Sequence, residues 1–257
     1  MAQDAGIGIF AAFLEGILLQ PTLYWKNARA QNKPFTINPA VVYRGSAASI
    51  FNECQMMGLQ FGIAALISKH LGEDTASGQS VGSIELISAI GGGSLGALFA
   101  TPVELIMIQQ QNKGGSILHT IERLGVAANP ALVFRGISMA LVRDSIYVGA
   151  MLGLTPILNR HFQQAYDCNP KASNFYASIV GGIVAAVPSH PFDLIKTCMQ
   201  GDLVKKKYTT ASNTMQSLWS EGGARRLFSG GFWRTLNITA TVYIANEINI
   251  WAKNILN

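Results

Sequence analysis

Charged residues are scarce in this chain of 257 residues. Asp, Glu, Lys and Arg make up 13% of it, whereas about a quarter is usual in a soluble domain. Hydrophobic residues account for 49%, and there are 26 glycines. This balance disfavours an ordinary soluble domain. It favours a membrane protein in which small residues let helices pack closely.

Cysteine is scarce too, and so are the usual signs of secretion. Cys54, Cys168 and Cys198 are odd in number and lack metal-ligand spacing, so neither a disulfide framework nor a zinc site is expected. Residues 5–19 have no basic start and no small-residue cleavage site. We expect them to form part of a mature membrane helix, not a signal peptide.

Several function classes find no support in the sequence. The net charge of +5 is not gathered into one patch, and no aromatic-interleaved basic motif is present, so nucleic-acid binding is not expected. No nucleophile–base pair or metal cluster is recognisable, so the sequence predicts no catalytic residues, no metal site and no enzyme.

The chain repeats itself three times. The first shared element is a proline followed by acidic or basic residues, and it closes an apolar run at QPTLYWKNARAQ (20–31), TPVELIMIQQQ (101–111) and HPFDLIKTCMQ (190–200). The second is an aromatic, basic and glycine element, which opens the next apolar run at NPAVVYRG (38–45), NPALVFRG (129–136) and ARRLFSGG (224–231). Three such units predict six apolar helices.

Each predicted helix exceeds the ~20 residues needed to span a bilayer. We place the helices at roughly 5–31, 44–69, 82–111, 134–161, 173–200 and 230–254. The sequence thus predicts an all-α membrane protein in which six transmembrane helices, in three pseudo-symmetric repeats, surround a central cavity. It forms one domain over 1–257, with repeats at approximately 1–76, 77–168 and 169–257.

Basic residues are concentrated in the loops that follow the odd-numbered helices. The Lys205–Lys207 run is the clearest example. The basic side is expected to face the inner compartment. Both termini are then expected on the opposite side, because the number of helices is even.

A proline occurs near the end of each odd-numbered helix, at Pro21, Pro102 and Pro191. Proline inside a helix removes a hydrogen bond and bends the axis, so three bends can converge on a common centre. An acid and a base three positions apart lie on one helix face. Around a threefold axis they can form a ring of ion pairs that closes one end of the cavity.

These three repeats, with P-x-[DE]-x-x-[KR] after odd helices and [YF]-R-G before even ones, resemble the mitochondrial carrier family. The resemblance covers essentially the whole chain. It implies an inner-membrane protein that moves a solute by alternating access through a central site. It also implies cardiolipin at the openings of the even helices, at Arg44, Gly45, Arg135, Gly136, Ser229 and Gly230. No other cofactor is expected.

The matrix-side ring departs from the family pattern in one pair. Leu23 replaces the acid of the first repeat and Met107 replaces the base of the second. By family topology these two residues face each other, so both charges of one pair are lost together, which can be energetically neutral. The remaining pairs are expected to be Asp193 with Lys26 and Glu104 with Lys196.

The opposite gate loses every charge of the family pattern. Its acid positions fall on Ala64, Thr155 and Asn249. The first repeat is also short, because Gly45 follows Pro21 by 24 positions against 34 and 39 in the later repeats. The amphipathic matrix helix of the family hardly fits there.

Candidate substrate residues lie about two helical turns into each even helix. They are Asn52, Glu53, Arg143, Asp144 and Asn237. A carboxylate for an amine and a guanidinium for a carboxylate would suit an amino acid or a similar zwitterion. A purely structural role for Glu53, and an intramembrane pair of Arg143 with Asp144, are the alternatives.

Two functions remain open from the sequence. In the first, the protein is a degenerate carrier that serves as an accessory or structural subunit of an inner-membrane assembly, with a respiratory complex as the candidate. In the second, it is an active transporter of an amino acid or similar zwitterion, with apolar packing in place of the missing gate. The lost charges favour the first function narrowly, whereas the usual activity of the family, which is transport, favours the second.

Overall fold

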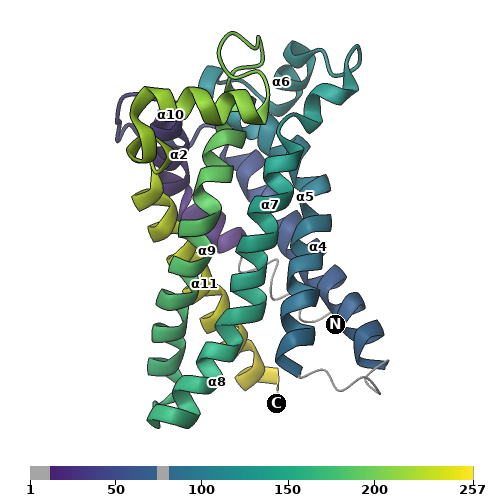
Figure 1. The fold of residues 1–257 in the computed structure, drawn as a ribbon, viewed down its shortest axis with the longest axis vertical. Helices are drawn as coiled ribbons and strands as arrows, with labels where there is room; N and C mark the ends of the chain where they lie inside the picture. The colour runs from purple at the N-terminus through teal and green to yellow at the C-terminus, as the bar shows by residue number, and fades with distance from the viewer. Residues whose placement is uncertain (1–11, 74–80, 257) are drawn as a thin grey trace.

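The computed structural model describes residues 12–73 and 81–256, and over these ranges the chain is helical without any strand (Figure 1). The first predicted stretch is helical at 12–18 and continues as α2 (Gln20–Ala30); its residues 5–11 lie outside the described ranges. The other five stretches form α4 (Ser46–Glu73), α5 (Val81–Lys113), α7 (Ile137–Val148) with η3 (Gly149–Leu154) and α8 (Thr155–Tyr166), α9 (Pro170–Gly201) and α11 (Gly231–Leu256). The predicted all-helical fold is confirmed.

Three helical segments are long and apolar enough to cross a membrane by length and composition. They are Leu86–Lys113, Pro130–Tyr166 and Pro170–Gly201. Many of their large apolar side chains point outward, as Phe99 and Val187 do. This arrangement, with apolar side chains outward and polar side chains inward, is the reverse of the pattern in a soluble protein. It is the pattern that a lipid environment requires.

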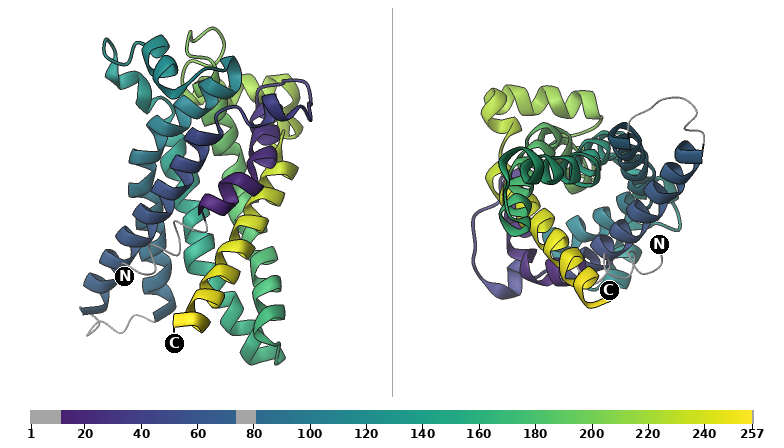
Figure 2. Two further views of the ribbon diagram at one scale, coloured as in Figure 1. Left: turned by 180° about the vertical axis from the view of Figure 1, so that it is seen from behind. Right: turned by 90° about the horizontal axis from the view of Figure 1, so that it is seen from below.

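The long helices form a closed ring. Each packs against its neighbour in chain order, α4 on α5, α5 on α7, α7 on α9 and α9 on α11, and α11 returns to α2. Viewed along the long axis, the helices encircle a central space (Figure 2). The short helices α6 (Ile117–Leu124) and α10 (Ala211–Leu227) lie together at one end of the ring (Figure 1). We call this the gate end.

The three predicted prolines lie toward the gate end of their helices. Pro21 occupies the first turn of α2, directly after the helix is interrupted at Leu19, while Pro102 and Pro191 lie inside α5 and α9. A further proline, Pro188, precedes Pro191 by one turn of α9. These positions bring the polar ends of all three helices toward one axis.

The second, fourth and sixth long helices, which are α4, α7 with its continuation, and α11, all begin after a glycine in the left-handed region. Gly45, Gly136 and Gly230 have φ of 77°, 83° and 86°. A side chain is strained at such φ, and a Cβ on Gly230 would also lie 2.9 Å from the Lys26 carbonyl oxygen. The glycine of the repeated sequence element is therefore required by the backbone turn into the helix.

The first repeat lacks a full surface helix at the gate end, as its short length predicted. Its segment α3 (Pro39–Val42) has only four residues, against eight in α6 and seventeen in α10. The α10 segment is itself broken by non-helical backbone at Gly222 and Gly223. The threefold pseudo-symmetry is thus least complete in the first repeat.

Candidate functional site

Both predicted ion pairs of the matrix-side ring are present. The ammonium of Lys26 on α2 lies 2.9 Å from a carboxylate oxygen of Asp193 on α9. Lys196, one turn further along α9, pairs with Glu104 on α5. All four side chains are buried. The pairs tie α2, α5 and α9 together at the gate end.

Two arginines extend this ring, and sequence reasoning did not assign either to it. Arg143 on α7 lies 2.7 Å from Glu104 and 3.2 Å from Asp193, and its Nε and Nη2 each donate to Asp144 over 2.7 Å. Arg234 on α11 lies 3.0 Å from Asp193. The prediction of two pairs was therefore incomplete. Among the described residues the ring is one connected cluster, and it includes Arg143 of α7 and Arg234 of α11.

The connected cluster carries a surplus of positive charge. Its cations are four and its acids three: Lys26, Arg143, Lys196 and Arg234 against Glu104, Asp144 and Asp193. Charges removed from water need close partners of opposite sign. The surplus therefore attracts one further anion, either from the protein or from a bound solute.

The third side of the ring is apolar, as expected from the joint loss of its charges. Met107 forms a buried cluster with Ala48 and Ile108, and Leu23 packs against that cluster. Beyond it, toward the gate end, amides replace ions: the Asn27 side chain donates to Gln111 over 2.8 Å. The mixed ring is closed by ion pairs on two sides and by packing on the third.

A cavity of about 90 Å³ opens directly below the ion pairs. All five candidate substrate residues line it: Asn52, Glu53, Arg143, Asp144 and Asn237. Arg234, Tyr147 and Thr241 line it as well, and no repeat-phased motif marks these three residues. Acidic and basic side chains thus face one small cavity.

The candidate residues differ in how far the protein already engages them. Asp144 is held by Arg143, and the Asn237 amide donates to Thr22 Oγ1 over 2.8 Å. Glu53 makes no ion pair with any described residue, and the Asn52 side-chain oxygen has no hydrogen-bond partner. Glu53 and Asn52 are therefore the groups with binding capacity left for a solute.

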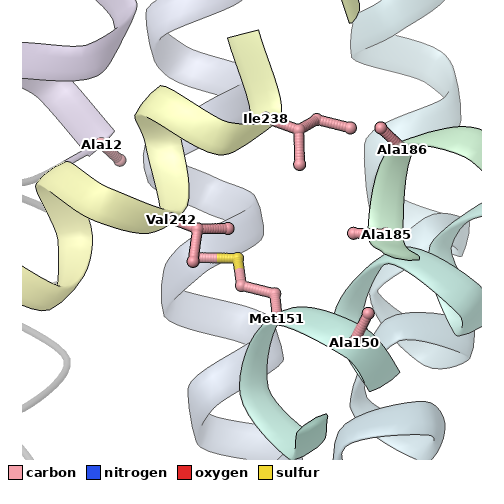
Figure 3. Packing of buried hydrophobic residues seen from close by; sticks show 7 residues of the cluster. All are labelled: Ala12, Ala150, Met151, Ala185, Ala186, Ile238 and Val242. Atoms are coloured by element: carbon pink, nitrogen blue, oxygen red, sulfur yellow. The ribbon is translucent and has the colours of Figure 1, made fainter. Parts of the chain in front are cut away.

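An apolar cluster joins the helices next to the cavity, and Figure 3 shows its side chains. It draws on all three repeats and consists of Ala12, Ala150, Met151, Ala185, Ala186, Ile238 and Val242. Ile238 also lines the cavity, and Tyr147 of the cavity wall packs against the cluster. We call this the apolar plug. Along their helices its residues lie further from the gate end than the ion-paired residues do.

The π-helical segment η3 supplies part of this plug. Ala150 and Met151 belong to it, and in Figure 3 the Met151 side chain extends toward Val242 of α11. A π-turn widens a helix and often marks a functional site. At Thr155, where the family pattern has an acid, the hydroxyl donates to the Ala150 carbonyl and the residue packs on Gly181. Asn249 occupies the corresponding acid position of the last repeat, and its side chain lies outside the described residues.

The side chains at the expected lipid sites are partly engaged within the protein. The Arg135 guanidinium donates to the Met199 carbonyl over 2.6 Å and to that of Asp202 over 3.0 Å. The Ser229 hydroxyl donates to the Arg29 carbonyl over 3.1 Å. Of the backbone N–H groups directly after Gly45 and Gly230, that of Ser46 donates to the Tyr43 carbonyl and that of Gly231 to the Phe228 carbonyl. Across the described ranges, no three His, Cys, Asp or Glu side chains group as metal ligands.

Comparison with known proteins places this geometry in a family. A model described as "Mitochondrial carrier protein" matches residues 169–249, which carry Pro191, Asp193 and Lys196. Over these residues the chain is similar to the mitochondrial carrier family. The ion-pair cluster lies beside the repeated proline motif, where the resemblance to that family predicts a matrix-side gate.

The relatives of this chain share low sequence identity with it. The chain is 24% identical to a human mitochondrial glycine transporter over 79% of its own length and 67% of the relative's. It is 23% identical to mitochondrial 2-oxodicarboxylate carrier 2 of Saccharomyces cerevisiae, over 74% and 64%. A solute carrier protein of Fusarium pseudograminearum is 23% identical, over 63% and 59%. The chain thus spans less than two thirds of the length of the last two relatives. All three relatives are named as transporters or carriers.

Proposed function

We propose that this carrier moves a small zwitterionic solute, an amino acid in the first instance, across the mitochondrial inner membrane by alternating access. The observation that carries the proposal is the charge pattern of the central cavity. A gate cluster with one surplus cation forms one wall, and the unpaired acid Glu53 faces the same space. The naming of distant relatives as glycine transporters supports the same substrate class.

The binding chemistry follows from these two walls. The carboxylate of the solute compensates the surplus positive charge at Arg143, and the ammonium of the solute binds Glu53 and the Asn52 oxygen. Charge-assisted hydrogen bonds of this kind are the strong ones in proteins. A cavity of about 90 Å³ favours a small solute.

Binding of the solute also loosens the gate. Arg143 holds Glu104 of α5 and Asp193 of α9 at once. A solute carboxylate competes with these acids for the guanidinium, so binding weakens the contacts that keep the helices together. A ligand shifts a conformational equilibrium by its differential affinity for the two states, and this competition supplies such a difference.

The apolar plug provides the second gate that alternating access requires. The sequence lacks the charged network of the family at this side, and that loss favoured an accessory role. Packing of small and apolar side chains from three repeats can close the side instead, because buried apolar area stabilises contact without any ion pair. The missing charges alone therefore do not argue against transport.

Orientation and lipid contacts are part of the same proposal. With the gate end toward the matrix, the basic Lys205–Lys207 loop faces the inner compartment, and both termini face the intermembrane space. Cardiolipin phosphates bind the backbone N–H groups at the openings of the even helices. Three left-handed glycines of similar φ support this placement.

Reconstitution of the full chain into cardiolipin-containing liposomes tests the function. We expect saturable uptake from a panel of glycine, alanine, glutamate and lysine. Glu53→Gln should lower kcat/KM for the transported solute about 10- to 100-fold, because one charge-assisted contact contributes about 1.5–3 kcal/mol. Glu247→Gln is the matched control, since Glu247 accepts a 2.6 Å bond from Asn174 and does not line the cavity.

The outcome also separates transport from the accessory role. Absence of saturable exchange for every solute of the panel, with the chain correctly folded, would contradict the transport proposal. Migration with a large complex from mild-detergent membranes would then favour an accessory subunit. Equal uptake by the Glu53→Gln and Glu247→Gln variants would leave transport intact but remove Glu53 from the site.

A further inference from the structure

A second, smaller cavity adjoins the central one. It has a volume of about 20 Å³ and lies between the helical turns at 12–18, α2, α4 and α11. Glu53, Asn237 and Thr241 belong to the walls of both cavities. A space of this size accommodates about one water-sized group. The small cavity therefore suits a single small ligand beside the solute cavity.

Buried oxygen atoms without hydrogen-bond partners line this small cavity. Glu15 is 3% exposed, and one of its carboxylate oxygens has no partner among the described residues. The side-chain oxygens of Gln20 and Ser49, each 1% exposed, also have none there. Buried polar groups in folded proteins are rarely left unpaired. Three such oxygens from three helical segments indicate a ligand that binds oxygen.

The amide groups of the cavity wall use their nitrogens elsewhere. The Gln20 nitrogen donates to the Val42 carbonyl over 3.5 Å. The Asn237 nitrogen donates to Thr22 Oγ1 over 2.8 Å and to the Leu19 carbonyl over 3.4 Å. Each amide therefore has its oxygen, and not an N–H group, to offer to the small cavity.

The charge balance of this region leaves Glu15 uncompensated. The gate cluster has one surplus cation, and two of its cations, Lys26 and Arg143, act on Glu53. That surplus balances Glu53. Glu15 then adds one negative charge; it makes no ion pair with any described residue, and the charged group that acts on it is Glu53. A buried carboxylate without a partner of opposite sign is costly, so the region requires one further positive charge.

Three small ligands meet these demands unequally. A water molecule would bind the oxygens but bring no charge. A proton on Glu15 would bring the charge but leave the oxygens of Gln20 and Ser49 without partners. A monovalent metal cation meets both demands, since hard cations bind carboxylate, amide and hydroxyl oxygens. A divalent cation would replace the missing charge with an excess of one.

The backbone beside the cavity has a form that suits such a cation. The helical turns at 12–18 are interrupted at Leu19, which lines the cavity, and α2 begins at Gln20. Unwound stretches between half-helices coordinate sodium ions in transporters. The helical turns also approach α4 closely, because a Cβ on Gly16 would lie 2.6 Å from Ile50 Cγ1. Close packing on this side favours a small ion.

We propose that the small cavity binds one sodium ion, held by the carboxylate of Glu15 and by the side-chain oxygens of Gln20, Ser49 and Asn237. The ion ties the helical turns at 12–18 to α2, α4 and α11. A zwitterionic solute has no net charge, so its entry into the central cavity leaves this balance unchanged and the ion stays bound. The site does not depend on transport, because its ligands and its charge balance are the same without a solute.

The melting temperature of the full chain in mild detergent tests the site. Sodium chloride is compared with choline chloride at equal ionic strength, so that screening is the same. Sodium should raise the melting temperature of wild type by several °C in a saturable way, because a ligand of the folded state stabilises it by mass action. Ser49→Ala should shift this rise to higher sodium concentrations. Glu247→Gln, whose side chain lies outside the cavity, is the matched control and should keep the full rise.

Glu15→Gln is the decisive variant. It should abolish the response to sodium, and in choline chloride it should melt no lower than wild type, because it removes a buried charge that lacks a partner. Radioactive sodium should bind at one ion per chain in wild type and not at all in Glu15→Gln.

Four results would overturn the proposal. They are no sodium binding by wild type, equal responses of wild type and Glu15→Gln to sodium, full replacement of sodium by magnesium, and an infrared band of a protonated carboxylic acid that persists in saturating sodium and disappears in Glu15→Gln. The last result would assign the site to a proton. None of these measurements uses transport, so a failure of solute uptake in liposomes refutes the proposed function without deciding the sodium site.

Discussion

Removal of the Asp193 charge should destabilise this protein more than removal of an exposed carboxylate. Asp193 is 2% exposed and contacts three cations, Lys26 at 2.9 Å, Arg234 at 3.0 Å and Arg143 at 3.2 Å. Asp193→Asn keeps the shape of the side chain but leaves these cations without their common partner. Breaking a buried ion pair from one side costs about 3–5 kcal/mol.

Thermal denaturation in mild detergent measures this effect. For a chain of this size each 1 kcal/mol shifts the melting temperature by about 2–4 °C, so the expected fall is roughly 6–20 °C. Asp167→Asn is the matched control. Asp167 is exposed at the end of α8 with φ of 49°, a conformation that asparagine tolerates, so its effect should stay within about 0.5 kcal/mol. A fall for Asp193→Asn no larger than that of the control would refute the view that the gate cluster stabilises this state.

Three further outcomes are expected. Gly93→Ala should lower the melting temperature through about 1–3 kcal/mol of overpacking, because its Cβ would lie 2.4 Å from the Asp144 carbonyl oxygen; Gly62→Ala, with no atom within 4 Å of the new Cβ, should not, and equal effects would argue against close packing of α5 on α7. Leu23→Asp and Met107→Lys should each destabilise the protein when introduced singly, while the double variant recovers about 0.5–3 kcal/mol of coupling in a double-mutant cycle; strictly additive losses would show that the two side chains do not meet. Burial acts to raise the pKa of Asp202, but backbone N–H groups of Tyr208, Lys207 and Lys206 hold that pKa below its ordinary value of 3.8. The order of this loop should therefore be complete above the ordinary pKa and be lost as the pH falls through the lowered one. Protection factors for amide hydrogen exchange at residues 203–208 that stay constant from neutral to strongly acidic pH would count against it.

The sequence by itself determined the helical architecture of this protein. Apolar runs of bilayer length, prolines at Pro21, Pro102 and Pro191, and glycines before each even helix are local signals, because each depends on the conformational limits of one short segment. The pairing of Lys26 with Asp193 and of Lys196 with Glu104 was also expected, because the resemblance to the mitochondrial carrier family implies that the acid of each repeat meets the base of the next. The short first surface segment followed from residue spacing alone.

Only the tertiary structure decided which cations reach which acids and where buried groups remain unsatisfied. Arg143 meets Asp193 from 50 positions away and Arg234 meets it from 41, and no repeat-phased motif marks these contacts because long side chains choose partners only after the helices have packed. The apolar plug likewise depends on a π-turn that shifts Met151 toward α11, which no residue pattern announced. A small cavity beside Glu15 lies between the helical turns at 12–18, α2, α4 and α11, so it is a property of the packed ring and not of any one of its segments.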